Sequence, residues 1–226
     1  MLRSLDPPLV LASRSPRRRE LLAGAGVPLE IRAADIAEDA QPGESPEATA
    51  LRLASEKALA VSDALEPGTR RWVLGADTLV ILDDVLLGKP RDAAHAVEML
   101  SRLVGRQHRV VTGVALVDSR TRAVRAISVE TRVVMRPAAP DEIRAYVATG
   151  EPLDKAGAYA IQGGGRRFIE QVEGSETNVI GLPLEETLDL MRATLAAKPG
   201  RDRRAVSPPE ASPRVRRAKS RRETDP

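Results

Sequence analysis

Short apolar runs alternate with segments whose apolar residues recur at helical spacing over most of the chain. Residues 8–12 form one such run, which ends abruptly at Ser13, and Pro16 then opens a helix, since proline is tolerated in a first helical turn. The same patterns predict strands at residues 8–12, 29–33, 71–75, 78–82, 107–117, 124–135 and 168–172, and helices at 16–25, 45–65, 92–103, 141–149 and 183–197. Strands alternating with helices indicate an α/β fold, and a long hairpin turning at residues 118–122 indicates a mixed sheet.

The composition narrows the chemistry that this fold can carry. One Trp, two Tyr and one Phe leave the core to aliphatic side chains and argue against a surface that binds nucleic acid by base stacking. Cysteine is absent, which excludes disulfides, thiolate zinc sites and cysteine nucleophiles. With only His95 and His108 as imidazole ligands, a required metal should sit on carboxylate oxygens, which favours Mg²⁺ or Mn²⁺. No apolar run approaches membrane-spanning length and no signal peptide is evident, so we expect a cytoplasmic protein.

The net charge of +3 comes from one end of the chain. Residues 198–226 hold ten Lys or Arg and four Asp or Glu, so the preceding 197 residues are mildly acidic. This last segment is rich in Pro, Ser, Arg and Lys and cannot bury a core. We therefore expect one domain over residues 1–197 and a disordered basic tail over 198–226, with any binding of nucleic acid weak and confined to the tail.

The first candidate site joins a strand end to a helix start. Ser13, Ser15, Arg17 and Arg18 converge there, at a helix N-terminus whose unpaired N–H groups attract anions. Arginine suits bidentate contact with phosphate. The alternative is a serine-capped helix with a solvated basic first turn. Because cations at this end oppose the helix dipole, phosphate binding is the favoured interpretation.

Two further candidates follow in the middle of the chain. Asp77, with Thr78, comes after an apolar run at an expected strand end, where α/β folds place ligands. Asp77 could bind a metal or take a proton from water, but a simple turn aspartate explains the spacing equally well. Lys89 lies on a Gly-Lys-Pro turn before a helix and could contact phosphate. Taken alone, Lys89 is more readily explained as an exposed turn lysine followed by the helix cap Asp92.

The glycine-rich segment near the C-terminal helix carries the remaining polar candidates. Asp154 and Lys155 precede small residues that allow close backbone approach, and Gln162 could hydrogen-bond a base edge; a flexible hairpin is the alternative. The glycines at 163–165 are not followed by Lys-Ser or Lys-Thr, so this is not a P-loop. Glu38 and Lys57, taken singly, have the pattern of solvated surface charge.

Taken together, these segments resemble the Maf family of nucleoside triphosphate pyrophosphatases. The resemblance covers roughly residues 8–197 and rests on several motifs in register, at residues 11–18, 20–22, 75–78, 88–92, 151–159, 161–163 and 181–184. It implies an α/β fold with a mixed, twisted sheet in two lobes around a central cleft, as in the related ITPase-like enzymes, and usually a homodimer. It also implies hydrolysis of a nucleoside triphosphate to the monophosphate and pyrophosphate.

The resemblance assigns roles to the candidate residues. It implies Asp77 as the catalytic carboxylate, with Glu38 beside it near a divalent metal. The implied substrate-binding residues are Ser13, Ser15, Arg17, Arg18, Lys57, Thr78, Lys89, Asp154, Lys155 and Gln162. At the three specificity positions, Arg17, Thr78 and Gln162, the chain is similar to the branch that prefers dTTP and UTP, including modified pyrimidine nucleotides.

The chain departs from the family pattern at two positions, and two other functions are compatible with its sequence. Glu176 stands where many relatives have an aromatic residue, which affects the expected base preference, and Ala160 stands where glycine is frequent. One rival is a non-enzymatic regulator, because the family is linked to cell-division arrest. The other is a pyrophosphatase for another modified nucleotide such as 7-methyl-GTP. For the dTTP and UTP pyrophosphatase itself, the resemblance implies a role in keeping modified nucleotides out of nucleic acids.

Overall fold

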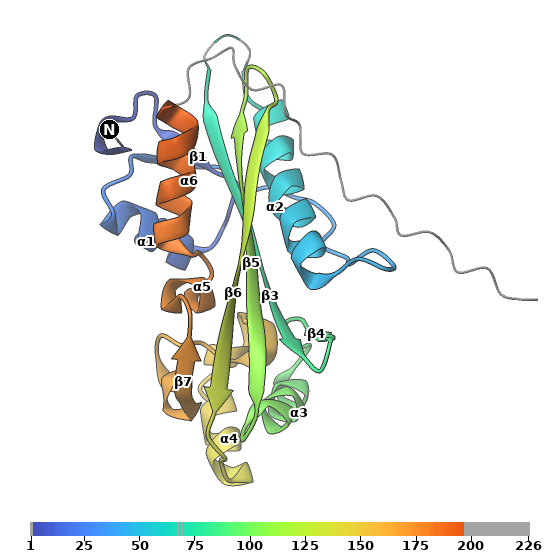
Figure 1. The fold of residues 1–226 in the computed structure, drawn as a ribbon. Helices are drawn as coiled ribbons and strands as arrows, with labels where there is room; N and C mark the ends of the chain where they lie inside the picture. The colour runs from blue at the N-terminus through green and yellow to red at the C-terminus, as the bar shows by residue number, and fades with distance from the viewer. Residues whose placement is uncertain (1, 67, 69, 197–226) are drawn as a thin grey trace, which may run out of the picture. The chain divides into compact units, whose positions relative to one another are not determined.

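A seven-stranded mixed sheet organises the chain in the computed structural model, which describes residues 2–66, 68 and 70–196 (Figure 1). Its strands are β1 (Leu9–Leu11), β2 (Leu29–Ile31), β3 (Trp72–Leu82), β4 (Val85–Leu87), β5 (Gln107–Asp118), β6 (Val124–Met135) and β7 (Ile169–Glu173). They lie in the order β2-β1-β3-β5-β6-β7, and β4 pairs with the far end of β3. The two β1 pairings are parallel and the others are antiparallel, which confirms the predicted mixed α/β fold.

Apart from the short α5, the helices of the described residues lie close to their predicted positions. They are α1 (Pro16–Gly24), α2 (Pro46–Asp63), α3 (Ala93–Leu103), α4 (Pro140–Val147), α5 (Glu176–Ile180) and α6 (Leu184–Ala196). The hydroxyls of Ser15 and Ser45 and the carboxylate of Asp92 each accept a hydrogen bond from a backbone N–H of the first turn, which explains where α1, α2 and α3 begin. The sequence pattern missed the short α5 and the 3₁₀ turns at Glu151–Asp154, Ala156–Ala158 and Gly164–Phe168, because such short elements carry no periodic signal.

Strand β3 differs from the prediction in a way that matters for function. Two separate strands were expected at residues 71–75 and 78–82, but β3 is continuous and pairs with β5 from Trp72 to Ile81. Asp77 therefore lies in the middle of a strand and not at its end. The parallel pairing with β1 stops at Leu74, so β3 continues past the carboxyl end of β1 with Asp77 just beyond it.

Helix α2 packs unusually closely on the sheet. A Cβ built on Gly75 would lie 2.1 Å from the carbonyl oxygen of Ala54, and one on Gly113 would lie 2.2 Å from that of Ala50. Glycine is required at both positions because the helix backbone occupies the space of a side chain. Since alternate residues of a strand face the same side, Asp77 points with Gly75 toward α2. Thr78 points to the other face, where α1, α5 and α6 lie (Figure 1).

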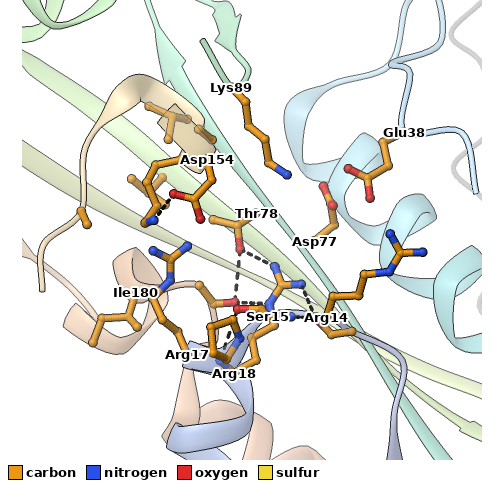
Figure 2. Close-up of a pocket in the computed structure, with 18 of the residues that line it drawn as sticks. Arg14, Ser15, Arg17, Arg18, Glu38, Asp77, Thr78, Lys89, Asp154 and Ile180 are labelled. Carbon is orange, nitrogen blue, oxygen red and sulfur yellow. Dashed lines mark hydrogen bonds and ion pairs between the residues drawn. The ribbon is translucent and has the colours of Figure 1, made fainter. Parts of the chain in front are cut away.

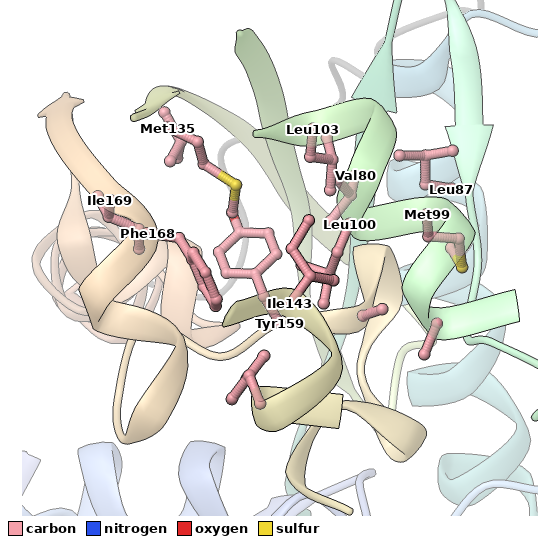
Figure 3. Close-up of a cluster of buried hydrophobic side chains, with 14 of the residues drawn as sticks. Val80, Leu87, Met99, Leu100, Leu103, Met135, Ile143, Tyr159, Phe168 and Ile169 are labelled. Atoms are coloured by element: carbon pink, nitrogen blue, oxygen red, sulfur yellow. The ribbon is translucent and has the colours of Figure 1, made fainter. Parts of the chain in front are cut away.

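The hydrophobic core has two main parts, which occupy different halves of the long strands. One contains Leu74 and Leu116 with residues of α1 and α6, and the other contains Val80 and Val110 with residues of α3 and α4. This division agrees with the two lobes expected from the sequence. The second part holds Tyr146, Tyr159 and Phe168, three of the chain's four Phe, Trp and Tyr residues. Figure 3 shows Tyr159 among Met135, Ile143 and Leu100, where it anchors the segment that leads to Gln162.

Within the described residues, no helix is long and apolar enough to cross a membrane. The predicted domain end at residue 197 and the predicted disorder of residues 198–226 lie outside the part of the chain that the structure describes. Both stay predictions.

Candidate active site

A cavity of about 570 Å³ opens where β1 ends and β3 continues. Its walls come from the β1–α1 junction, the loop before α2, the middle of β3, the β4–α3 turn and residues 154–162. All the residues singled out from the sequence line this one cavity: Ser13, Ser15, Arg17, Arg18, Glu38, Lys57, Asp77, Thr78, Lys89, Asp154, Lys155 and Gln162. The structure thus gathers segments up to 149 positions apart, from Ser13 to Gln162.

At the centre of the cavity, one lysine ammonium contacts two carboxylates. Lys57 Nζ lies 2.6 Å from Asp77 Oδ1 and 2.7 Å from Glu38 Oε1. Asp77 and Lys57 are buried, at 6% and 8% exposure, whereas Glu38 stays open to solvent. Although partial burial alone would raise the pKa of Glu38, the hydrogen bond and charge of Lys57 lower it, with help from Lys89. Figure 2 shows Lys89, Asp77 and Glu38 pointing toward the same space.

The loop that carries Glu38 is tied to α2 by a charged cluster. Arg52 donates hydrogen bonds of 2.7 and 2.8 Å to the two oxygens of Glu44 and one of 2.9 Å to the carbonyl of Asp39. The Arg52 hydrogen bond is the main reason why the pKa of Glu44 falls to about 2. The sequence pattern predicts no role for this pair. Its signal was only a glutamate just before the cap of α2 and an arginine eight residues later, which is also typical of a surface helix.

The two adjacent arginines of α1 are used differently. Arg18 donates hydrogen bonds to the carbonyls of Ala76 and Gly181, both at 2.8 Å, and to the hydroxyls of Ser13 and Thr78 at 3.3 and 3.0 Å. Burial lowers the pKa of the Arg18 guanidinium, and the nearby Asp77 charge opposes that effect. Arg17 Nε, in contrast, has no hydrogen-bond partner among the described residues. Although burial alone would raise the pKa of Asp154, Lys155 and the charge of Arg17 lower it.

Hydrogen bonds to buried side chains anchor the segment that carries Asp154, Lys155 and Gln162. Tyr159 Oη lies 2.7 Å from the buried His108 Nε2. The Glu151 carboxylate accepts hydrogen bonds from Tyr146 Oη at 2.8 Å and from the backbone N–H groups of Gly164 and Gly165 at 3.0 and 3.3 Å. These contacts fix the chain on both sides of Gln162. His108 received no role from the sequence because a lone histidine at a strand start has no distinguishing pattern.

The carboxylates of this cavity suit a metal ion that is bound partly by the protein and partly by its substrate. Within the described residues, no three His, Cys, Asp or Glu side chains come close enough to form a metal site. Asp77 and Glu38 nevertheless meet at one point, since both contact the same ammonium. Mg²⁺ commonly binds one or two protein carboxylates and completes its shell with water and substrate phosphates. The donor set therefore fits a hard divalent cation that arrives with a phosphorylated substrate.

Comparison with known proteins gives a consistent result over most of the chain. The family model described as "Maf-like protein" matches residues 8–194. The dTTP/UTP pyrophosphatase of Geobacter metallireducens is 49% identical over 184 residues, which cover 81% of this chain and 94% of that protein. The protein of the same name from Anaeromyxobacter sp. is 53% identical over 190 residues, 81% of this chain and 88% of that one.

A more distant solved structure was also found. It is a nucleoside-triphosphatase, or dITP/XTP pyrophosphatase, of Mycobacterium abscessus, with a TM-score of 0.38 and 16% identity over 84% of this chain and 97% of that one. This similarity is too low to support any conclusion about this chain.

Proposed function

This chain belongs to the Maf-like protein family, and from that premise we propose that it hydrolyses dTTP and UTP to the nucleoside monophosphate and pyrophosphate. The single observation that carries the proposal is the buried Asp77–Lys57 pair at the centre of a cavity ringed by cationic side chains. An ionised carboxylate kept next to an ammonium is suited to hold and activate water beside a polyanion. The names of the relatives, which match over nearly their whole length, support the same reaction and the pyrimidine substrates.

The chemistry assigned to the chain is positioning and charge stabilisation. Asp77 orients a water molecule toward the α-phosphorus and accepts a proton from it. Arg17, Lys89 and Lys155 offset the charge of the departing pyrophosphate, as groups aimed at developing charge do in phosphoryl chemistry. Lys57 holds Asp77 and Glu38 in place through its two short contacts.

A divalent cation, Mg²⁺ or Mn²⁺, belongs to this proposal. Asp77 and Glu38 would hold it. When bound, it would neutralise phosphate charge and help to align the leaving group. We also infer that the protein is a cytoplasmic homodimer, as the family resemblance implies.

The base preference is assigned to the wall opposite Asp77. Gln162 lies in the cavity beside Ile161, on the segment anchored by Tyr159 and Glu151. Gln162 is exposed to solvent in the structure, and its side-chain amide can hydrogen-bond a pyrimidine edge. A site whose polar groups are buried and paired by the correct base rejects a base that leaves them unpaired. Glu176, the departure noted in the sequence, lies in α5 and is not among the cavity residues.

A nucleotide panel tests the proposal. Pyrophosphate release is measured for dTTP, UTP, CTP, the purine triphosphates, 5-methyl-UTP and 7-methyl-GTP, with Mg²⁺, with Mn²⁺ and with chelator. We expect metal-dependent release from dTTP and UTP, and a loss on the order of 10²–10³-fold or more in Asp77→Asn. Release from 7-methyl-GTP alone would overturn the substrate assignment. No release from any nucleotide by folded protein would overturn the enzyme proposal and favour a regulator of cell division.

A further inference from the structure

We propose that Arg18 is a positioning residue and not a ligand of the triphosphate. Its guanidinium hydrogen-bonds to β3 on both sides of Asp77, at Ala76 and Thr78, and to Gly181, and we call this set of contacts the clasp. This inference rests on the proposed function and deepens it. It separates two adjacent arginines, Arg17 and Arg18, to which the sequence assigns the same role.

The first support is the number of N–H groups with which the Arg18 guanidinium can donate hydrogen bonds. A guanidinium has five N–H groups and no acceptor. Four of the five are donated to the protein: Nε to Gly181 O, Nη1 to Ala76 O and to Ser13 Oγ, and Nη2 to Thr78 Oγ1. One N–H remains, so Arg18 cannot make a bidentate contact with phosphate without releasing the protein acceptors. Releasing a half-buried carbonyl costs the hydrogen bond that satisfies it.

The second support is where the acceptors lie on β3. Leu74 O accepts the N–H of Ala12, so this carbonyl points toward β1. Ala76 O, two residues on, points the same way, but β1 has ended and β4 pairs only from Val80. The sheet leaves this edge of β3 open for a short stretch around Asp77. The Arg18 guanidinium fills the opening and binds Ala76 and Thr78, the residues on either side of Asp77. Figure 2 shows its contact with Thr78.

The third support is the hydroxyl of Thr78. This hydroxyl can donate one hydrogen bond and accept two. Its contacts are Gly181 O at 3.2 Å, which can only accept, Arg18 Nη2 at 3.0 Å, which can only donate, and Thr112 Oγ1 at 2.9 Å. Thr112 can donate its single hydroxyl hydrogen either to Thr78 or to Asn178 O at 3.5 Å, and in both cases the Thr78 hydrogen is donated within the protein, to Gly181 O or to Thr112. The Thr78 hydroxyl has no hydrogen left to donate to a base. Thr78 therefore influences the substrate through the clasp that it shares with Arg18.

The clasp also reaches the opposite wall of the cavity. Gly181, in the turn between α5 and α6, accepts hydrogen bonds from both Arg18 Nε and Thr78 Oγ1. The two residues before it, Val179 and Ile180, line the cavity. Arg18 thus sets the distance between Asp77 and the apolar wall against which the substrate would lie. A misplacement of about 1 Å between reacting groups can cost on the order of 10²-fold in rate.

Arg17 provides a matched control on the next residue. It also lines the cavity, but its buried Nε has no hydrogen-bond partner among the described residues, whereas the Nε of Arg18 donates to Gly181 O. If Arg17 binds phosphate and Arg18 positions β3, glutamine substitutions at the two sites should separate binding from turnover.

The test compares Arg18→Gln, Arg18→Lys and Arg17→Gln with the full wild-type chain. It measures kcat and KM for dTTP, calorimetric affinity for a non-hydrolysable α,β-methylene analogue of dTTP, and amide hydrogen exchange in peptides covering residues 74–79 and 179–183. For Arg18→Gln we expect kcat to fall on the order of 10²-fold and analogue affinity to change by less than about threefold. Exchange should become faster in both peptides. Arg18→Lys should recover part of kcat, because an ammonium can still donate to some of the same acceptors.

For Arg17→Gln we expect the opposite pattern, with affinity for the analogue reduced about tenfold or more and exchange in the two peptides unchanged. The inference is overturned if Arg18→Gln weakens analogue binding as much as Arg17→Gln does and leaves exchange unchanged. Should Arg18→Gln fail to fold, Thr78→Val carries the same test, because it removes the hydroxyl that contacts both Arg18 and Gly181. A wild-type chain that does not hydrolyse dTTP would refute the proposed function, whereas the exchange measurement would still decide whether the clasp exists.

Discussion

Replacement of Gly75 by alanine tests how closely α2 must approach the sheet to place Lys57 on Asp77. The new Cβ would lie 2.1 Å from Ala54 O, which falls short of the 3.4 Å of an ordinary contact by 1.3 Å. The obstacle is helix backbone, so α2 itself has to move. A shift of this size is large beside the 2.6 Å contact between Lys57 and Asp77, because hydrogen bonds from nitrogen to oxygen weaken beyond about 3.2 Å.

Two losses should follow from the same displacement. Overpacking of a well-filled core costs roughly 1–3 kcal/mol, so the free energy of unfolding of Gly75→Ala should fall by about that amount in urea denaturation. The rate of dTTP hydrolysis should fall on the order of 10²-fold, since the carboxylate and its ammonium are no longer in register. Both quantities are measured on the same preparation, at urea concentrations where the variant is still folded.

Gly24→Ala is the matched control. Gly24 ends α1, and a Cβ there would meet no atom within 4 Å, so stability and activity should be unchanged or slightly improved. If Gly75→Ala unfolds at the wild-type urea midpoint and hydrolyses dTTP at the wild-type rate, close packing of α2 on β3 is not what positions Lys57.

Three other perturbations probe separate parts of the site. Gln162→Ala should reduce the preference for dTTP over dGTP about tenfold in kcat/KM, and an unchanged ratio would remove its role in base selection. Lys57→Met should bind free Mn²⁺ at least about tenfold more tightly than the wild type in spin-resonance titrations without nucleotide, because one ammonium no longer occupies the carboxylates; equal affinities would contradict this. Glu44 has a pKa held at about 2 by Arg52, below its ordinary 4.5, so its contribution to stability is present above pH 4.5 and is lost as the pH falls toward 2. Glu44→Gln should therefore be less stable than the wild type by roughly 1 kcal/mol at pH 7, after allowing for solvent screening, and the difference should disappear near pH 2; a difference independent of pH would contradict the ion-pair explanation.

Much of the fold follows from local patterns. Helical spacing and serine or aspartate caps located α1, α2 and α3, because the hydrogen bonds that start a helix come from side chains within three residues of its first turn. The strand pattern failed at Ala76 and Asp77, which separate the two predicted strands at residues 71–75 and 78–82. Those residues continue β3 because β5 pairs with them and α2 covers them, and both partners are remote in the sequence.

The amino-acid sequence by itself predicted which side chains gather in one place, because its hydroxyls, arginines and isolated carboxylates stand in motifs with the order and spacing of one family. The structure places all of these side chains around one cavity. Only the tertiary structure decided how these groups divide the work. Arg17 and Arg18 are adjacent and both were expected to bind the substrate, yet the rotation of about 100° between consecutive helix positions directs Arg18 into the open edge of β3 and leaves Arg17 Nε without a partner among the described residues. The reason is physical: the use of a guanidinium depends on the acceptors within reach. Apart from Ser13, those of Arg18 come from positions 76, 78 and 181, which meet only when the sheet and the α5–α6 turn have packed together.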